Sequence, residues 1–403
     1  MTIAPRADAP AVPGVNNGKP LRVAIFSEVY WPMVSGVGVT LRRLTDSLQA
    51  RGHSVRVYSP AYPIPDGMVE RPEAFRVPSV PFFLYPDVRW AFPRMSEVVQ
   101  DARRFGPDLV HVATEFSMGV TGVKVARALG LPVVASAHTD YEQYADRYYR
   151  VGWAIGVGWH YLRWFYGHTA TVLCPSHHFE RHLNCRGVLN TGVWSRGIDS
   201  ERFHPRYRSA DFRRAVGAGE RDIVVTYVGR IAREKNLLLL IDAWELLGAD
   251  RRGAQLVLVG RGPLEHEIRE RAVPGVHLVG LKRGDDLATA YASADLFAFP
   301  STTETFGNVL LEAMASGLPP LVAAAGGVLE IARHGINSWL VEPDSTDALV
   351  AGLARLLVDE PLRRRLSAGA LDTARERSWR SVDDELVADY RQVLARGSRR
   401  RAA

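Results

Sequence analysis

The hydrophobic positions of the chain follow two alternating patterns. Short, almost continuously apolar runs, such as Leu21–Ser27 and Pro132–Ala137, alternate with longer segments whose apolar residues recur at helical spacing, such as Val39–Ala50. Short apolar runs are typical of strands buried on both faces, with helices covering the sheet. The pattern therefore predicts an α/β protein with parallel sheets. The other strand-like runs are Ser54–Ser59, Asp108–Val112, Thr171–Cys174, Asp222–Gly229, Gln255–Gly260, Val276–Val279, Ala294–Phe299, Pro319–Ala323 and Ser338–Val341.

The alternation of strands and helices occurs twice, which predicts two Rossmann-like, doubly wound domains. Residues 191–205 carry turn and extended residues without a helical period, so we place the hinge there. Ligands of such sheets bind at the carboxyl ends of the strands, beside helix N-termini that favour anions. The predicted organisation is a flexible N-terminal arm (1–20), an N-terminal domain (21–198), a C-terminal domain (199–375) and a C-terminal segment (376–403). In that last segment a helix (about Ser381 to Ala395), followed by a basic tail, packs back toward the N-terminal domain.

Composition narrows the class of protein. A chain of 403 residues with 47% hydrophobic residues is typical of a globular protein of two or three domains, not of a disordered or collagen-like one. Two cysteines cannot form a disulfide framework, and no run approaches the ~20 apolar residues that span a bilayer. Because Met1–Pro20 also lacks the apolar core of a signal peptide, we expect a cytoplasmic protein. The net charge of +6 is compatible with nucleic acid, an anionic membrane or an anionic small molecule.

The polar loop Thr303–Asn308 follows a predicted strand and leads into a predicted helix, Val309–Ala315. Backbone N–H groups at the start of this helix could hold a phosphate. Glu304 lies in the loop, and Glu312 lies about two turns into the helix, where its carboxylate could accept hydrogen bonds from a ribose diol. Alternatively, Glu304 is a favourable acid in the first helical turn and Glu312 a charge on the helix surface. The local sequence leaves both interpretations open.

Two cations follow the first strand of the second half. Arg230 comes directly after the run Asp222–Gly229, and Lys235 precedes the predicted helix Leu237–Leu247. At a strand-to-helix loop they could neutralise a diphosphate, Arg230 by its planar fork and Lys235 as a mobile point charge. The alternative is a pair of solvated loop cations. Their place at the carboxyl end of a strand favours the diphosphate interpretation.

Two weaker signals lie in the first half. The turn containing Gly36 follows the first strand and opens a helix, so its backbone could approach a phosphate or sugar. It lacks the third glycine of a dinucleotide fingerprint and the lysine of a phosphate-binding P-loop. His138 follows the strand Pro132–Ala137 and could hydrogen-bond a sugar hydroxyl. A single loop histidine is more often incidental, so neither signal decides by itself.

The spacing of Cys174, His178, His182 and Cys185 is superficially that of a zinc site. However, Ser176 is a good N-cap for a helix through this segment, and Cys174 ends an apolar strand where it would be buried. We therefore reject zinc and expect no bound metal.

An aromatic-rich segment, residues 141–166, contains Tyr141, Tyr148 and Tyr149, with Arg147, Arg150 and Arg163 nearby. Aromatic stripes are commonly core residues. The alternative is an acceptor-binding surface that receives a lipid-linked or lipid acceptor at an anionic membrane. A second aromatic group lies around Phe82 to Phe92, and both interpretations stay open for each.

Taken in order, these features resemble the retaining glycosyltransferases of the GT-B fold, specifically the family-4 group with mannosyltransferases and sulfoquinovosyl-lipid synthases. The most specific part is the spacing of Glu304 and Glu312 around Phe306-Gly307. The resemblance covers nearly the whole chain. Its other motifs are Ser35-Gly36-Val37, Pro107–His111, His138, Arg196–Pro205, Val228-Gly229-Arg230, Lys235, Val259–Pro263 and Ala315–Pro319.

The resemblance implies two domains facing each other across a cleft, a nucleotide-sugar donor bound mainly by the second, no cofactor and no bound metal. It implies front-face transfer that retains the anomeric configuration, with the departing diphosphate helping to deprotonate the acceptor hydroxyl. The implied catalytic residues are Arg230, Lys235, Glu304 and His138. The implied donor contacts are those of Arg230 and Lys235 with the diphosphate, Glu312 with the ribose, Glu304 with the sugar, and Gly36 and the backbone of Phe306, Gly307, Asn308 and Val309 with phosphates and sugar.

Residues 192–205 and the tyrosines after His138 look most like those of GDP-mannose-dependent α-mannosyltransferases. Two departures leave the donor base open, since Ser35 stands where relatives often have glycine and Arg261 where they often have aspartate. The alternatives are a glycosyltransferase that uses a UDP-sugar, a phosphorylase or epimerase of the same fold, and a non-catalytic nucleotide-sugar-binding protein. No zinc-finger or RNA-binding aromatic pattern supports a nucleic-acid partner.

Overall fold

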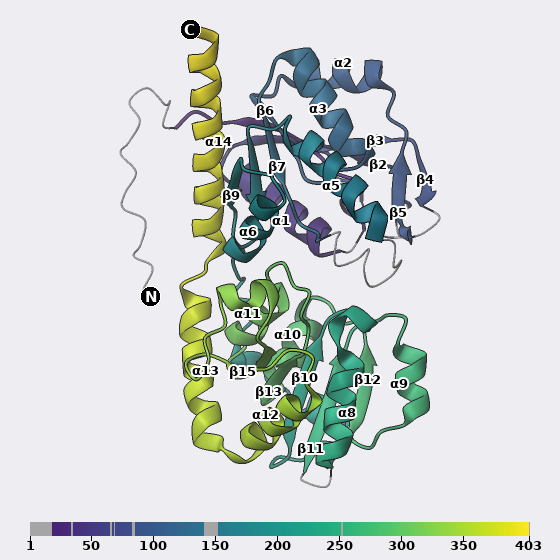
Figure 1. Cartoon of the computed structure of the whole chain (residues 1–403), viewed down its shortest axis with the longest axis vertical. Helices are drawn as coiled ribbons and strands as arrows, with labels where there is room; N and C mark the ends of the chain where they lie inside the picture. Colours follow the sequence, from purple (N-terminus) through teal and green to yellow (C-terminus); the bar gives the residue numbers. More distant parts are fainter. Residues whose placement is uncertain are drawn as a thin grey trace. The chain divides into compact units, whose positions relative to one another are not determined.

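The computed structural model describes residues 18–402 except residues 34, 65–66, 68, 83–84, 141–151 and 251–252. The chain, coloured along its sequence in Figure 1, forms two compact units. The first comprises the described residues up to Ala137, Tyr161–Leu173, and the chain from Asp383 onward. The second comprises the described residues of His138–His160 and Cys174–Val382. Most of the predicted N-terminal arm lies outside the described residues.

A seven-stranded sheet has the strand order β3-β2-β1-β6-β7-β8-β9. Strand β1 (Arg22–Phe26) pairs in parallel with β2 on one side and β6 on the other, and is buried at all positions after Arg22. Burial on both faces explains the continuous apolar runs. In chain order the elements to residue 193 are β1, α1 (Gly36–Ala50), β2 (Ser54–Pro60), β3 (Ala74–Val77), β4 (Ser79–Phe82), β5 (Tyr85–Ala91), α2 (Met95–Phe105), β6 (Leu109–Val112), α3 (Ser117–Leu129), β7 (Val133–Ser136), α5 (Gly152–Tyr166), β8 (Thr171–Cys174), α6 (His177–Cys185) and β9 (Thr191–Val193).

Helix α1 begins where the side chain of Ser35 caps it, accepting a hydrogen bond from the N–H of Gly38 at 3.0 Å. Leu41, Leu44 and Leu48 lie on its buried face, at the spacing that predicted the helix. The helix starts three residues before the predicted Val39, because the cap precedes the first apolar residue of the stripe.

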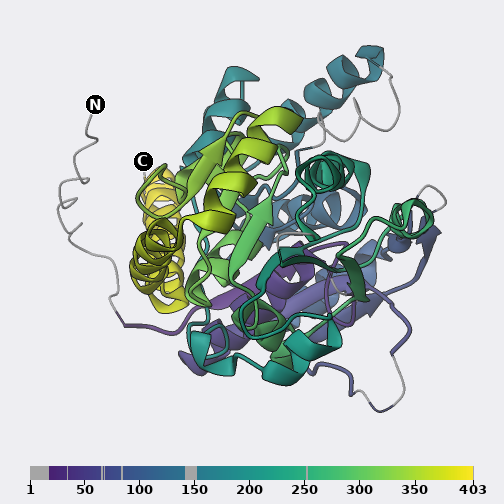
Figure 2. The same ribbon diagram turned by 90° about the horizontal axis from the view of Figure 1, so that it is seen from below.

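The second unit contains a six-stranded parallel sheet of order β12-β11-β10-β13-β14-β15. Figure 2 shows helices on both of its faces, with α8 packed against α12 and α11 against α13. Every predicted strand of this half is present within two residues of its predicted bounds. In chain order the elements are η1 (Pro205–Tyr207), α7 (Ala210–Ala215), β10 (Ile223–Val228), η2 (Arg233–Lys235), α8 (Leu237–Leu247), β11 (Ala254–Val259), α9 (Glu265–Arg271), β12 (Val276–Gly280), α10 (Gly284–Ala292), β13 (Leu296–Phe299), α11 (Asn308–Ala315), β14 (Pro320–Ala323), η4 (Gly326–Glu330), β15 (Trp339–Val341), α12 (Thr346–Val358), α13 (Glu360–Arg375) and α14 (Trp379–Ala402).

The C-terminal helix α14 is anchored by buried polar contacts within the first unit. The hydroxyl of Tyr390 lies 2.6 Å from Nδ1 of His111, whose Nε2 lies 2.8 Å from the hydroxyl of Ser136. Burial lowers the pKa of His111 to about 3, so its ring is neutral. Asp383, also buried, forms an ion pair with Arg43 of α1. Within the described residues, no helix combines the length and the hydrophobicity that a bilayer-spanning segment needs.

Candidate functional site

The candidate site lies where the strand order of the second sheet reverses. Strands β10 and β13 are parallel neighbours. Strands β11 and β12 follow on the side of β10, and β14 and β15 follow on the side of β13. Arg230 follows β10, and Glu304 lies in the loop after β13. Ligands of open α/β sheets bind at such a switch point, outside the carboxyl ends of the strands.

Lys235 and Glu304 join the two loops. Nζ of Lys235 lies 2.6 Å from Oε1 of Glu304, and the hydroxyl of Ser301 donates to the same oxygen at 2.9 Å. The two charged side chains are only 19% and 17% exposed, so Lys235 is not a solvated loop cation. Asn236 adds a further link, because its side-chain amide donates to the carbonyl of Pro300 at 3.1 Å.

Arg230 is held at the end of β10 but keeps a third of its side chain in contact with solvent. Its guanidinium lies 3.5 Å from the buried carboxylate of Glu234, and its carbonyl accepts a hydrogen bond from the hydroxyl of Tyr227 at 3.0 Å. Arg261 lies exposed in the neighbouring loop, where its carbonyl accepts from the N–H of Ile231 at 2.9 Å. These contacts fix the loop that carries Arg230, whose guanidinium can form charge-assisted hydrogen bonds with an anion.

Helix α11 begins without a side-chain cap. Gly307 occupies the N-cap with φ of 92°, and Phe306 before it is buried. The first turn of α11 contains no acidic residue, so the alternative that placed Glu304 in that turn is wrong. Asn308 and Val309, both half-buried, open the helix, and the backbone N–H groups at this end suit an anionic group.

The segment carrying Glu304 rests on Gly327 of η4. The N–H of Gly327 donates to the carbonyl of Glu304 at 2.6 Å. A Cβ at this position would lie 2.1 Å from the carbonyl oxygen of Thr305, so only glycine permits the approach. The sequence analysis missed this support, although the Gly326-Gly327 pair marks it.

Glu312 is half-buried and hydrogen-bonded, so the alternative of a helix-surface charge is wrong. Its Oε2 accepts a hydrogen bond from the hydroxyl of Tyr291 at 2.9 Å. Burial raises the pKa of Glu312 to about 7, against the lowering effects of the Tyr291 hydroxyl and the charge of Arg202. Such shifts are common at functional sites. Sequence spacing could not reveal Tyr291, which belongs to another helix.

His138 lies within the second unit, beside the loop of Glu304. Its carbonyl accepts a hydrogen bond from the hydroxyl of Thr305 at 3.4 Å, and its Nδ1 lies 2.9 Å from a guanidinium nitrogen of Arg196. The ring meets Trp194 edge to face, with centroids 6.0 Å apart. The structure therefore brings His138 and the loop that carries Glu304 together, although they are far apart in the sequence.

Gly36 begins α1 and is described with the first unit alone. Tyr141, Tyr148 and Tyr149 lie outside the described residues, so their role stays a prediction.

The cysteine and histidine segment forms the predicted capped helix. The hydroxyl of Ser176 accepts from the N–H of Phe179 at 3.1 Å, which confirms it as the N-cap of α6. Cys174 is buried, as predicted, whereas Cys185 is exposed. Among the described residues, no three His, Cys, Asp or Glu side chains are grouped to hold a metal ion.

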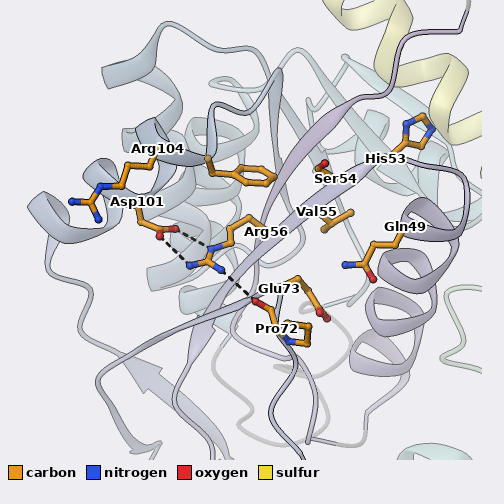
Figure 3. A pocket seen from close by; sticks show the side chains of 10 residues that line it. Gln49, His53, Ser54, Val55, Arg56, Pro72, Glu73, Asp101 and Arg104 are labelled. Carbon is orange, nitrogen blue, oxygen red and sulfur yellow. Dashed lines mark hydrogen bonds and ion pairs between the residues drawn. The ribbon is translucent and has the colours of Figure 1, made fainter.

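A pocket of about 530 Å³ in the first unit lies away from the carboxyl ends of the strands (Figure 3). Ser54, the first residue of β2, lines it, so it opens at the amino end of that strand. Its central polar groups pair with each other, because Arg56 forms two hydrogen bonds with Asp101, at 3.0 and 2.9 Å. The pocket is therefore not part of the candidate site.

Comparison with known proteins assigns the chain to a family. Residues 34–202 match the model described as Glycosyltransferase Family 4, and residues 209–372 match the model described as Glycosyl transferases group 1. A GDP-mannose-dependent alpha-mannosyltransferase of Mycolicibacterium smegmatis is 34% identical over 95% of this chain and 100% of the relative. The sulfoquinovosyl transferase SQD2 of Arabidopsis thaliana is 30% identical over 94% of this chain and 75% of the relative.

Solved structures show the same fold. Sucrose-phosphate synthase from Thermosynechococcus elongatus superposes with a TM-score of 0.75 at 21% identity, covering 93% of this chain and 99% of that one. Anabaena HepE in complex with UDP and glucose superposes with a TM-score of 0.72 at 20% identity, covering 92% and 99%. With the two parallel sheets, these likenesses confirm the predicted GT-B fold. The chain therefore belongs to glycosyltransferase family 4, the retaining GT-B enzymes that transfer a sugar from a nucleotide-sugar donor.

Proposed function

We propose that this chain transfers mannose from GDP-mannose to a hydroxyl of a lipid-linked, lipid or glycan acceptor. The donor is supported by relatives named GDP-mannose-dependent alpha-mannosyltransferase from Mycolicibacterium smegmatis, Corynebacterium glutamicum and Mycobacterium tuberculosis, 30–34% identical over 93–95% of the chain. The assignment of the site is supported by two ion pairs at the loops after β10 and β13, Arg230 with Glu234 and Lys235 with Glu304.

In this proposal Arg230 and Lys235 bind the diphosphate. Their present partners, Glu234 and Glu304, keep the cations in place without a ligand, and a diphosphate offers them a larger negative charge. The backbone at the start of α11, from Phe306 to Val309, would hold phosphate and sugar oxygens. Glu312 would accept hydrogen bonds from the ribose hydroxyls, and Glu304 would contact the sugar.

The proposed reaction breaks the bond between the anomeric carbon and the diphosphate oxygen, and the electron pair leaves with the diphosphate. The acceptor oxygen bonds to the same face of the sugar, and its proton passes to the departing phosphate. Charge therefore develops on the leaving group, where Arg230, Lys235 and the α11 amides act. Preorganised cations and amide dipoles at that place lower the barrier most.

A UDP-sugar donor is the second candidate. It is favoured by the likeness to SQD2 and to an alpha-monoglucosyldiacylglycerol synthase of Streptococcus pneumoniae, which is 31% identical over 74% of the chain and 70% of that relative. These names point to a glucose or sulfoquinovose donor and to a lipid acceptor.

Thermal unfolding with a panel of nucleotides separates the two donors. We expect GDP and GDP-mannose to raise the melting temperature, since a ligand at a hundred times its Kd adds ~2.7 kcal/mol of stability. Stabilisation by UDP but not by GDP would show that the donor is a UDP-sugar rather than GDP-mannose. No stabilisation by any nucleotide would contradict the proposed site.

Release of nucleoside diphosphate only when an acceptor is present would exclude phosphorylase and epimerase reactions, and binding without any transfer would favour a binding protein.

We also propose that the first unit binds an anionic membrane through the β4–β5 hairpin. Val80 and Trp90 are paired across the two strands, and Trp90 and Phe92 are 41% and 54% exposed. Residues two apart in an extended chain share a face, so these apolar groups form one exposed surface with Arg94 close in sequence. Aromatic groups beside basic ones suit the boundary of an anionic bilayer.

The described part of the aromatic segment is mainly core. Trp159, Phe165 and Tyr166 are buried, while Trp164 is exposed beside the exposed Arg163. The core interpretation therefore holds for three of these rings, and the hairpin is the better candidate for membrane contact.

Vesicle flotation tests this membrane proposal. The wild-type protein should float with anionic vesicles at low salt and release at high salt. The double substitution Trp90→Ser and Phe92→Ser should abolish flotation, whereas Val358→Ser, at a still more exposed apolar residue that ends α12, should not. Failure of the wild-type protein to bind anionic vesicles at low salt would contradict the proposal.

A further inference from the structure

Arg196 places a buried guanidinium against His138. The residue is only 4% exposed. One of its nitrogens, Nη1, donates to the carbonyls of Trp194 at 2.7 Å and Ser195 at 3.1 Å, and Nη2 lies 2.9 Å from Nδ1 of His138. The guanidinium also lies over the Trp194 ring, 4.7 Å from its centroid. These contacts hold Arg196 in one orientation.

The chemistry of this contact decides where the His138 proton resides. A guanidinium has only donors and is always charged, so Nδ1 of His138 must accept. A neutral imidazole with an unprotonated Nδ1 carries its proton on Nε2. The protonated ring would place a second N–H and a second positive charge against Arg196. The acidic residue closest to His138 in the sequence is Asp140, and one oxygen of its carboxylate lies 3.8 Å from Nε2 of His182.

We propose that Arg196 is a positioning residue that fixes His138 as the neutral tautomer with its proton on Nε2. His138 then offers a hydrogen-bond donor to a substrate oxygen and has no free lone pair with which to remove a proton. The assignment of a sugar or acceptor hydroxyl as that oxygen rests on the proposed function. It follows that the acceptor proton goes to the departing diphosphate rather than to His138.

The edge of the Trp194 ring and the Thr305 hydroxyl support the same arrangement. They contact the His138 ring and its carbonyl respectively, so both the ring and the backbone are fixed. A histidine free to rotate could exchange its two nitrogens, whereas this one cannot do so without losing the Arg196 contact. Arg196 is the first residue of the Arg196–Pro205 motif, and its place in this motif is what marks it in the sequence.

Nitrogen NMR of ¹⁵N-histidine-labelled full-length protein tests the tautomer directly. The chain has 12 histidines, and the signals missing from His138→Gln identify those of His138. We expect an unprotonated Nδ1 and a protonated Nε2 in the wild type between pH 6 and 8. A protonated Nδ1 of His138 in the wild type would overturn the proposal.

Two substitutions test whether Arg196 is the cause. In Arg196→Met we expect the two tautomers to mix and kcat for transfer from GDP-mannose to fall about tenfold, with a smaller change in KM. Arg196→Lys, which keeps a cationic donor, should recover part of both effects. The control is Arg186→Met, since Arg186 also lies over a tryptophan ring, 5.5 Å from the centroid of Trp159, but is exposed.

An unchanged His138 tautomer in folded Arg196→Met would overturn the proposal, and so would an altered tautomer with unchanged kcat. Absence of transfer by the wild type from any nucleotide sugar would instead contradict the proposed function. The NMR result does not depend on turnover, so the two failures are distinguishable.

Discussion

Replacing Arg230 or Lys235 with alanine is expected to lower kcat for sugar transfer ~10²–10³-fold while the protein stays folded. Each side chain would stabilise charge that develops on the departing diphosphate, and the loss of one preorganised donor has effects of this size in other enzymes. Initial rates of nucleoside diphosphate release at saturating donor measure the loss. Circular dichroism and the melting temperature establish that the variants are folded.

Arg233→Ala is the matched control. Arg233 lies between the two cations in sequence but is 71% exposed, and its ion pair with Glu267 lies at the surface. We expect nearly wild-type turnover, because an exposed pair contributes little. Lys235→Ala also removes a cation from Glu304, so the melting temperatures of Lys235→Ala and of its double variant with Glu304→Gln show how much stability the unpaired carboxylate costs. Nearly wild-type turnover in both Arg230→Ala and Lys235→Ala would contradict the assignment of the site.

Glu312→Gln is expected to change how stability depends on pH. The carboxyl has a pKa of about 7 in the folded chain and 4.5 as its ordinary value. Because the folded state binds the proton more tightly, this group stabilises the fold fully below pH ~4.5, and the contribution is lost as the pH rises through ~7. Relative to the glutamine variant, the wild type should lose up to ~3 kcal/mol between pH 4.5 and 8.

Urea unfolding of both proteins across this pH range measures the difference. Tyr291→Phe is a second probe, because its hydroxyl lowers the pKa of Glu312. Removing it should move the loss of stability to higher pH. A constant free-energy difference between wild type and Glu312→Gln at all pH values would contradict a raised pKa.

The same residue should couple nucleotide binding to pH. Ribose hydroxyls donate to a carboxylate, so donor binding favours the ionised form of Glu312 and releases a proton. Affinity for the nucleotide should therefore rise as the pH increases toward and above 7, and Glu312→Gln should remove this dependence. At pH 8 the variant should bind about 10–100-fold more weakly, the usual effect of losing a hydrogen bond to a charged group. Titration calorimetry in two buffers measures both affinity and proton release.

Much of the fold was predictable because apolar periodicity records burial. The helix Leu237–Leu247 coincides with α8, and the run Ser54–Ser59 with β2 to within one residue. The strands β3, β4, β5 and β9 were missed, since β3 and β9 lie at the edges of a sheet and β4 and β5 form a separate hairpin. The last helix extends past the predicted Ala395 to Ala402, where the basic residues carry no apolar stripe.

The residues of the site were easier to predict than the contacts that position them. Arg230, Lys235 and Glu304 could be chosen because they follow strands or precede a helix, and the structure places them at the switch point. Tyr291 and Ser301 were missed, because a hydrogen bond between two side chains, from different helices for Tyr291 and within one loop for Ser301, leaves no periodic signal. The pKa of Glu312 is raised because its carboxyl group is buried, and the spacing between Glu304 and Glu312 could not predict that burial.

The most direct measurement of the central claim compares the affinities of GDP and GMP by titration calorimetry. If Arg230 and Lys235 bind a diphosphate, GDP should bind the wild type at least 10-fold more tightly than GMP, since charge-assisted contacts to the second phosphate are strong. The preference should disappear in the Arg230→Ala, Lys235→Ala double variant. Equal affinity for GDP and GMP in the wild type, or a preference that persists in the double variant, would contradict the account.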